Sequence, residues 1–225
     1  SGDERVGIYL TNALTGWTLT VCAYSSAQAR AIRLKRSIDA ADGMRGNSEP
    51  WGKLSDDRKG RHSLVDHSAD VAAVFAALLR QPTIRRRLAA AAGLSDLGPV
   101  VCARLTALVF LHDIGKANRG FQARIDLQAA LVGHIDELAW VFHGEDRSKE
   151  PICEALAERI GLDRFSDWFA DSFSMLEAVF AHHGRPWRRE DAPDSLRHWK
   201  AAADRDPVAS LAPLRAKLDL WFVEA

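Results

Sequence analysis

The stretch FLHDIGKANRGFQ, residues 110–122, holds the side chains of this chain that are best suited to chemistry. An apolar run ends at Leu111 and is followed at once by His112 and Asp113, and then by Lys116. An imidazole and a carboxylate can both bind a metal ion, and a carboxylate has two oxygens with which to bridge two ions. An ammonium group beside them would stabilise an anion held there. The stretch therefore indicates a metal centre that binds an anion.

The geometry of this stretch follows from an expected helix over residues 97–116. Adjacent helical residues point about 100° apart, so His112 and Asp113 would both reach one cavity. Lys116 would lie on the same side of the helix, three residues after Asp113. Gly115, which has no side chain, would let a substrate or another backbone segment approach closely.

Four further histidines lie near the ends of expected helices or on apolar stripes: His67, His134, His182 and His183. Taken singly, each is best explained as an ordinary buried or surface histidine. Taken with His112 they indicate a shared site, since a metal ion can satisfy an imidazole nitrogen inside a helical bundle. The last two can reach one ion only where the chain leaves helical geometry, as it does at Gly184. For that pair, an exposed position is an equal alternative.

In this order and spacing, the motifs resemble the HD nuclease domain of the CRISPR-associated helicase-nuclease of type I systems. The resemblance is carried by HSLVDHSADVAAV (62–74), ALVFLHDIGKANRGFQ (107–122), GH (133–134) and AHHGRP (181–186). WGKL at 51–54 is similar to the segment that opens this family's domain, and the resemblance covers roughly residues 50–190.

The resemblance implies a centre with two divalent metal ions. It places three ligands around the first ion: His67, His112 and Asp113. The second ion would share Asp113 and take three imidazoles: His134, His182 and His183. Because histidine and carboxylate ligands suit transition metals, we expect Mn, Fe, Co or Ni, with Mg as an alternative. His62 is expected beside this centre rather than among its ligands.

The resemblance also implies a reaction and partners. It predicts endonucleolytic cleavage of single-stranded DNA, the displaced non-target strand in type I CRISPR interference, with Asp113 and Lys116 as catalytic residues. The partners would be this DNA, the type I surveillance complex and a superfamily 2 helicase. This sequence has no Walker A loop, so the helicase would be a separate chain or fused outside these residues.

One feature of the family is missing. The family closes its first metal site with an aspartate from a late helix, and no segment after Gly184 matches that motif. The aspartates available are Asp191, Asp194, Asp204, Asp206 and Asp219, of which Asp219 is the best placed on an apolar helix. We expect these residues to stop short of the family's aspartate.

Two alternatives to the nuclease stay open. The first is an HD phosphohydrolase acting on nucleotides, against which the motifs HHGRP and GKANRGFQ argue. The second is a degenerate HD domain that binds DNA or the surveillance complex without cutting, which the missing aspartate favours.

The elements that would position these residues are helices, so we predict an all-α fold, the helical bundle of HD domains. In residues 64–81 the apolar stripe consists of Leu64, His67, Val71, Val74, Phe75 and Leu78, and Pro82 ends the helix. Further helices are expected over residues 83–92, 97–116, 119–140, 150–160, 163–183 and 207–223.

The first part of the chain has a different pattern. Residues 5–24 hold two β-rich runs around the turn NALTG, and residues 25–40 predict a helix with a serine cap. We therefore expect a small β-β-α appendage of unknown role over residues 1–45 and the HD domain over 46–225. Residues 41–60, rich in Gly, Asp, Ser and Pro, predict a linker or loop.

The composition is that of an ordinary soluble globular protein. Of 225 residues, 47% are hydrophobic, and 30 basic side chains balance 30 acidic ones, so net charge indicates no partner. Three widely spaced cysteines fit neither a disulfide framework nor a CxxC zinc site, which indicates a reducing cytoplasm. No apolar run approaches the roughly 20 residues of a membrane helix. Three tryptophans flank basic residues and either pack in the interior or stack on unpaired bases: Trp51, Trp187 and Trp199.

Overall fold

The chain divides into two compact units, Ser1–Arg45 and Gly46–Ala225. A computed structural model describes residues 6–12, 17–23, 49–57, 60–126, 128–130, 132–135, 137–138, 151–169, 172–181, 196–223 and 225. In the first unit, strand β1 (Val6–Asn12) pairs antiparallel with β2 (Trp17–Ala23). This confirms the predicted hairpin, whereas the predicted helix over residues 25–40 lies outside the described residues.

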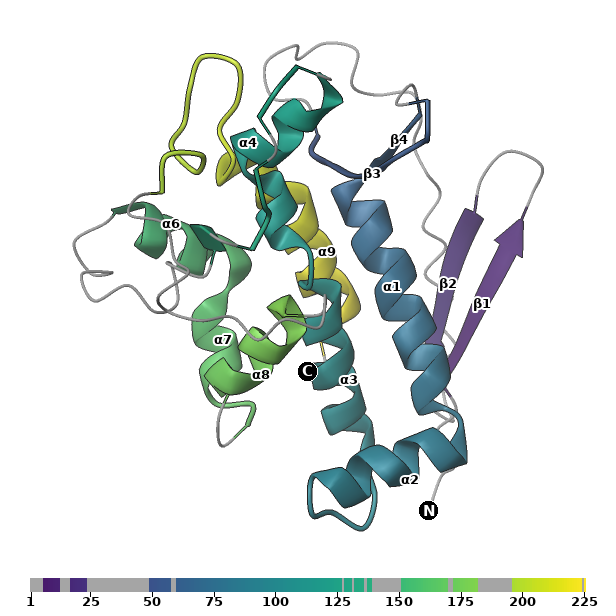
Figure 1. Ribbon diagram of the computed structural model, residues 1–225. Coiled ribbons are helices and arrows are strands. Elements are labelled where there is room, and N and C mark those ends of the chain that lie inside the picture. The colour runs from purple at the N-terminus through teal and green to yellow at the C-terminus, as the bar shows by residue number, and fades with distance from the viewer. Residues whose placement is uncertain are drawn as a thin grey trace. The chain divides into compact units, whose positions relative to one another are not determined.

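The second unit is a helical bundle, as predicted (Figure 1). Helix α1 (Leu64–Leu79) begins at Ser63, whose hydroxyl accepts a hydrogen bond from the backbone N–H of Asp66 at 3.0 Å. Helices α2 (Pro82–Ala91) and α3 (Pro99–Phe110) each begin with a proline, which has no N–H to leave unsatisfied in the first turn. Helices α1 and α3 lie side by side, with α2 across one end.

The later helices complete the bundle. They are α6 (Pro151–Ile160), α7 (Leu162–Ser166), α8 (Ser172–Phe180), the 3-10 helix η5 (Ala209–Leu211) and α9 (Ala212–Trp221). The main core lies between these helices and α1 and α3, and its most buried side chains include Leu64, Leu108, Phe110, Leu111, Ile114, Leu156, Ile160, Phe165, Leu176 and Leu211. A smaller cluster of Leu79, Ala89 and Leu97 lies where α1 and α3 meet α2.

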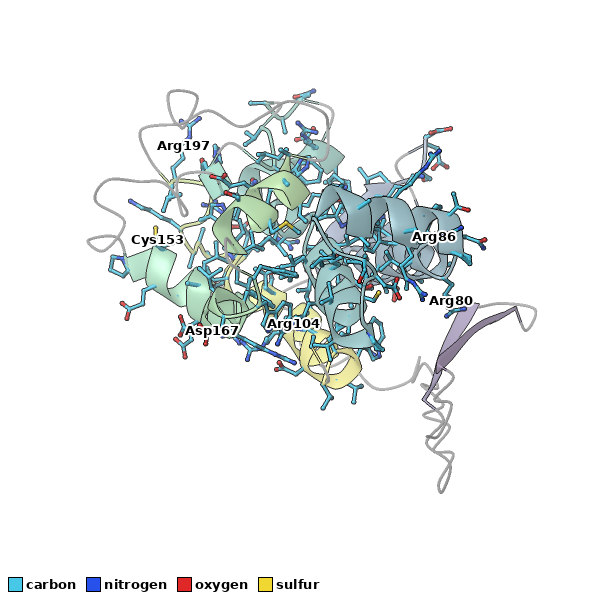
Figure 2. All side chains as sticks on the ribbon, turned by 90° about the horizontal axis from the view of Figure 1, so that it is seen from below. Arg80, Arg86, Arg104, Cys153, Asp167 and Arg197 are labelled. Atoms are coloured by element: carbon cyan, nitrogen blue, oxygen red, sulfur yellow. The ribbon has the colours of Figure 1, made fainter. Side chains whose placement is uncertain are left out.

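One charged side chain of α3, Arg104, is half-buried. Figure 2 labels it together with Arg80 and Arg86, which are exposed. The guanidinium of Arg104 donates a hydrogen bond to the carbonyl of Trp168 at 3.1 Å, and its Cζ lies 5.7 Å from the centre of the Trp168 ring. Arg104 therefore joins α3 to the segment after α7. None of the helices among the described residues could span a lipid bilayer.

Three of the predicted helices are wrong in extent. Helix α3 ends at Phe110 instead of continuing to residue 116, and the 3-10 helix η1 (Ile114–Ala117) follows a turn. In the predicted helix over 119–140, α4 (Arg119–Gln122) begins at Asn118, whose side chain accepts a hydrogen bond from the N–H of Phe121, and the 3-10 helix η2 (Ala123–Ile125) follows. Residues 128–130 and 132–135 are not helical, whereas residues 137–138 are. The predicted helix over 163–183 is interrupted after α7.

The prediction of a linker or loop over residues 41–60 is wrong for residues 51–54, while residues 41–48 lie outside the described residues. Strand β3 (Trp51–Leu54) pairs antiparallel with β4 (Arg61–Ser63), and the described residues between the strands, 55–57 and 60, belong to the connecting turn. In that turn Ser55 N–H donates to Gly60 O at 2.9 Å, and Gly60 N–H donates to the Ser55 hydroxyl at 2.8 Å. The hairpin packs on the first part of α1, at the end of that helix opposite to α2 (Figure 1). The predicted stripe of α1 is wrong at Val74 and Leu78, which are 60% and 43% exposed.

Candidate metal centre

The His-Asp turn, residues 111–113, directly follows α3. A helix was predicted here, but these residues form a turn. The N–H of His112 donates to Val109 O at 3.1 Å, and the N–H of Lys116 donates to Asp113 O at 2.9 Å. This tight path turns the chain back, so that Lys116 in η1 faces Asp113. Both members of the pair are buried, with Asp113 1% exposed.

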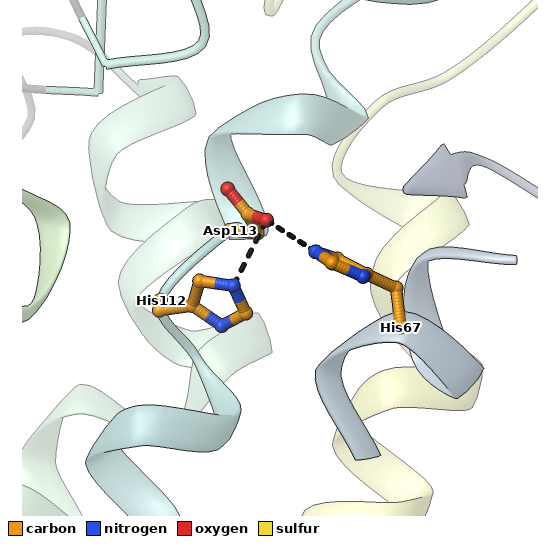
Figure 3. A group of neighbouring side chains, drawn as sticks. All are labelled: His67, His112 and Asp113. Carbon is orange, nitrogen blue, oxygen red and sulfur yellow. Dashed lines mark hydrogen bonds and ion pairs between the residues drawn. The ribbon is translucent and has the colours of Figure 1, made fainter. Parts of the chain in front are cut away.

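Four basic side chains converge on the carboxylate of Asp113. The Nε2 atoms of His67 and His112 lie 2.8 Å and 2.9 Å from its Oδ2, as the dashed lines in Figure 3 show. The ammonium of Lys116 lies 2.6 Å from the same oxygen. The other oxygen, Oδ1, lies 3.3 Å from Nε2 of His134. One buried carboxylate therefore contacts groups from α1, the turn, η1 and the segment that contains His134.

The environment of Asp113 determines its charge. Burial alone would raise the pKa of this carboxyl. Hydrogen bonds with His112, His134 and His67 outweigh burial and hold the pKa far below the ordinary value of an aspartate. Asp113 is therefore ionised at neutral pH, as a metal ligand must be.

The donor set fits a transition-metal ion. The ligand atoms of His67, His112 and Asp113 all lie within 4.8 Å of one another. Nδ1 of His112 lies 2.9 Å from Val109 O, and because a carbonyl only accepts hydrogen bonds, Nδ1 carries the proton. In the cationic ring Nε2 also carries a proton and donates a hydrogen bond to Asp113 Oδ2, whereas in the neutral ring Nε2 has a lone pair, and Nε2 and Oδ2, 2.9 Å apart, could then both bind one cation. Metal-binding histidines are commonly oriented by such a second hydrogen bond.

The segment with His134 reaches Asp113 because Gly115 has no side chain. A Cβ on Gly115 would lie 1.7 Å from the carbonyl oxygen of His134, so another residue cannot occupy this position without displacing the segment. The side chain of Asn118 donates to Gly133 O at 3.1 Å and to Gly115 O at 2.8 Å. The predicted close backbone approach at Gly115 is confirmed.

Hydrogen bonds between Glu137 and His198 hold the segment that contains His134 at a second point. The buried carboxylate of Glu137 accepts a hydrogen bond from the backbone N–H of His198 at 3.0 Å, and its other oxygen contacts Nδ1 of that histidine. The carbonyl of His198 in turn accepts from the N–H of Arg119 at 2.9 Å. The segment after residue 195 is thereby tied to the neighbourhood of His134.

Strand β3 contacts the centre through Gly52. Its carbonyl accepts a hydrogen bond from Nζ of Lys116 at 2.9 Å. A Cβ on Gly52 would approach Cβ of His67 to 2.7 Å, so β3 and α1 lie in direct contact here.

Of the seven residues predicted for the site, the structure brings together five: His67, His112, Asp113, Lys116 and His134. The other two, His182 and His183, lie outside the described residues. His62 contacts Asp70 at 2.9 Å on the exposed side of α1, consistent with a place beside the centre.

Other sequence candidates are engaged elsewhere. Asp219, the best candidate for a late aspartate, pairs with Arg215 at 2.8 Å and Arg164 at 3.3 Å. Trp51 and Trp199 are 7% and 1% exposed, so the packing alternative holds for both, while Trp187 lies outside the described residues.

Four positioning residues were missed by sequence reasoning: Asn118, Gln122, Glu137 and His198. The first two have a local signal, because both are polar residues within the short GKANRGFQ motif. The last two are 61 positions apart, and no local pattern joins them.

The chain is similar in sequence to known proteins. The family model described as "Cas3, HD domain" matches residues 51–223. The CRISPR-associated endonuclease/helicase Cas3 of Thermus thermophilus is 34% identical over 154 residues, which are 65% of this chain and 15% of that protein. This chain thus spans only a small part of the length of that relative. No solved structure matches the chain.

Proposed function

Because this chain belongs to the Cas3 HD-domain family, a family of CRISPR-associated HD nucleases, we propose that it cuts single-stranded DNA endonucleolytically with bound metal ions. The observation that carries this proposal is the convergence of three imidazoles and an ammonium on the buried carboxylate of Asp113. We assign the activity to residues 46–225 and treat residues 1–45 as a separate unit.

The proposed centre holds two divalent transition-metal ions, Mn, Fe, Co or Ni, with Mg as the alternative. The first ion would be bound by His67, His112 and Asp113. The second would be bound by Asp113, His134, His182 and His183. In support, the two oxygens of Asp113 face different groups, since Oδ2 faces His67 and His112 while Oδ1 faces His134. Such ions would lower the pKa of water and neutralise charge on a phosphodiester.

The side chains of the protein would perform the remaining tasks. Asp113 stays ionised in the metal-free protein, because hydrogen bonds to it outweigh its burial, so it would be ready to bind a cation. Lys116, which is 14% exposed and held by Asp113 and the carbonyl of Gly52, would place its ammonium against a phosphate oxygen and stabilise the charge that develops there.

The proposed substrate is the non-target strand that is displaced in type I CRISPR interference. The relative's name joins endonuclease and helicase, which supports a helicase acting on the same strand, either as a separate chain or fused outside these residues. We propose the type I surveillance complex as the partner that delivers the strand.

The test is metal analysis of the purified protein together with cleavage of circular single-stranded DNA in the presence of Mn or Ni. A circle has no ends, so its cleavage requires an endonuclease. We expect two ions per chain and cleavage that is lost in Asp113→Ala. Asp70→Ala, which removes an exposed aspartate that also contacts a histidine, is the matched control and should cut normally. Bound metal without cleavage of the circle would contradict the proposal.

One observation favours a second candidate, a domain that binds DNA or the surveillance complex without cutting. Asp219 forms ion pairs with two arginines. Among the described residues, the cluster that could hold a metal ion, His67, His112 and Asp113, contains one aspartate. This candidate predicts binding of single-stranded DNA in a filter assay, at most one ion per chain, and no cleavage with any of the metals.

A further inference from the structure

Gln122 is a buried amide at the end of α4, 5% exposed, that joins two parts of the second unit. Its Oε1 accepts a hydrogen bond from the backbone N–H of Trp51 at 3.0 Å. Its Nε2 donates to Trp51 O at 2.9 Å and to Lys116 O at 2.7 Å. The indole N–H of Trp51 in turn donates to the carbonyl of Gln122 at 3.3 Å. A single side chain therefore binds strand β3 to helix η1.

The two parts joined in this way are the parts that hold Lys116. Gln122 binds the carbonyl of Lys116, and Gly52, next to Trp51 in β3, accepts the hydrogen bond from its Nζ. The position of β3 therefore determines the position of the Gly52 carbonyl. This carbonyl and the carboxylate of Asp113 together bind the ammonium of Lys116.

We propose that Gln122 is a positioning residue that fixes the ammonium of Lys116 for the reaction by clamping β3 to η1. This inference rests on the proposed function, in which Lys116 stabilises a phosphate oxygen. Gln122 touches no reacting atom and acts through Trp51, Gly52 and Lys116.

The clamp requires an amide at this position. The carbonyl oxygens of Trp51 and Lys116 need hydrogen-bond donors, and the backbone N–H of Trp51 needs an acceptor. The side-chain amide of a glutamine supplies both the donors and the acceptor. A glutamate of the same shape keeps the acceptor and sets an oxygen against two carbonyl oxygens. Gln122→Glu therefore breaks the clamp with almost no change in volume. Gln122→Met is a second variant that removes every polar atom without adding a charge.

The first readout needs no activity. In metal-free protein at fixed pH, acetylation rates of individual lysines are measured by mass spectrometry under native conditions. We expect the rate at Lys116 to rise about 10-fold in Gln122→Glu or Gln122→Met, because the clamp no longer suppresses local opening. The rate at the exposed Lys200 should not change. The control Gln128→Glu changes an exposed glutamine and should leave Lys116 protected. Unchanged protection of Lys116 in either folded variant would overturn the proposal.

The second readout separates positioning from a general structural role. In the wild-type background, Gln122→Glu should lower kcat by about 10–100-fold with little change in KM, the size of effect seen when a supporting residue around a metal site is lost. In a Lys116→Met background the same change should lower kcat less than about 3-fold, because the effects of substitutions at contacting residues do not add. Equal losses in both backgrounds would show a merely structural role.

The two readouts also keep this inference apart from the proposed function. If the wild-type protein cuts no DNA but Lys116 loses protection in the variants, the clamp exists and the nuclease proposal fails. If the wild-type protein cuts DNA and Lys116 stays protected in the variants, the nuclease proposal stands and the clamp fails.

Discussion

Two histidine–aspartate contacts of nearly equal length lie on or beside α1, and they differ in burial. His67 Nε2 is 2.8 Å from Asp113, and His62 Nε2 is 2.9 Å from Asp70. The side chain of Asp113 is 2% exposed, whereas that of Asp70 is 65% exposed. Three further basic groups contact Asp113. The distance between imidazole and carboxylate thus does not separate the candidate metal centre from an exposed ion pair, whereas burial and the number of converging groups do.

The physical reason for this difference is solvation. Water solvates two exposed charged groups whether or not they form an ion pair, so an exposed pair contributes only about 0–1 kcal/mol to the free energy of folding. A buried charge that loses its partners has no water to replace them, and the cost is about 3–5 kcal/mol. The following predictions test whether the two contacts differ in function as they differ in burial.

The largest effect is expected for Asp113→Asn. The amide keeps the shape of the side chain but offers one carbonyl oxygen in place of two charged ones, so it binds metal weakly and cannot bridge two ions. We expect a loss of cleavage greater than the roughly 100-fold that removal of a supporting residue costs. Elemental analysis should show fewer bound ions. Asp70→Asn should keep cleavage and metal content within about 2-fold, and equal losses in the two variants would remove the distinction between the two contacts.

The next effect is expected for Lys116→Met, which removes a positive charge but no metal ligand. Cleavage should fall about 100- to 1,000-fold, the cost of one group that stabilises developing charge. The number of bound ions should stay at the wild-type value, unlike in Asp113→Asn. Lys53→Met, on the exposed side of the same strand as Gly52, is the matched control. Normal cleavage by Lys116→Met would show that this ammonium has no catalytic role.

A smaller effect is expected for Gly115→Ala. The added Cβ would lie 1.7 Å from the carbonyl oxygen of His134, so the segment must move away from Asp113. We expect a loss of about 1–3 kcal/mol in the free energy of unfolding and weaker binding of the second ion. Urea unfolding and metal titration measure the two quantities. Gly98→Ala is the control, because a Cβ there meets no atom within 4 Å. If the two alanine variants behave alike, the close approach at Gly115 does not matter.

The ionisation of Asp113 gives a prediction about pH in the metal-free protein. The pKa of this carboxyl is lower in the folded than in the unfolded state, so its ionisation stabilises the fold above the unfolded value of about 4. This contribution declines as the pH falls below that value toward the folded pKa. The stability difference between the wild type and Asp113→Asn should therefore shrink between about pH 5 and pH 2. A difference that stays constant over this range would mean that the folded pKa is not lowered.

The smallest effect is expected for His62→Asn, which breaks the exposed contact with Asp70. Cleavage should change less than about 2-fold and stability less than about 0.5 kcal/mol, as for other exposed substitutions. A large loss of cleavage with unchanged stability would instead place His62 in the centre.

The sequence alone predicted the helical class, α1 and the candidates that meet at Asp113, because these depend on apolar periodicity and on a motif with several fixed positions. It did not predict the turn at residues 111–113, since the sequence has no Pro or Gly between Pro99, where the helix begins, and Gly115. In the structure the helix ends at Phe110, and the turn carries His112 and Asp113 into the interior.

Two further features were not predicted. The stretch that holds β3 was predicted as a linker or loop, because the turn between β3 and β4 has a linker's composition and the two strands are only four and three residues long. The hydrogen bonds of Gln122 to Trp51 and of Glu137 to His198 span 71 and 61 positions. Only the folded structure brings these pairs together.

We propose that two metal ions share the carboxylate of Asp113. Electron paramagnetic resonance of the protein loaded with Mn²⁺ tests it most directly, because two ions bridged by one carboxylate are magnetically coupled. We expect the spectrum of a coupled pair in the wild type and in Asp70→Asn, and the loss of this spectrum in Asp113→Asn. A wild-type spectrum of isolated ions at full metal loading would contradict the shared carboxylate.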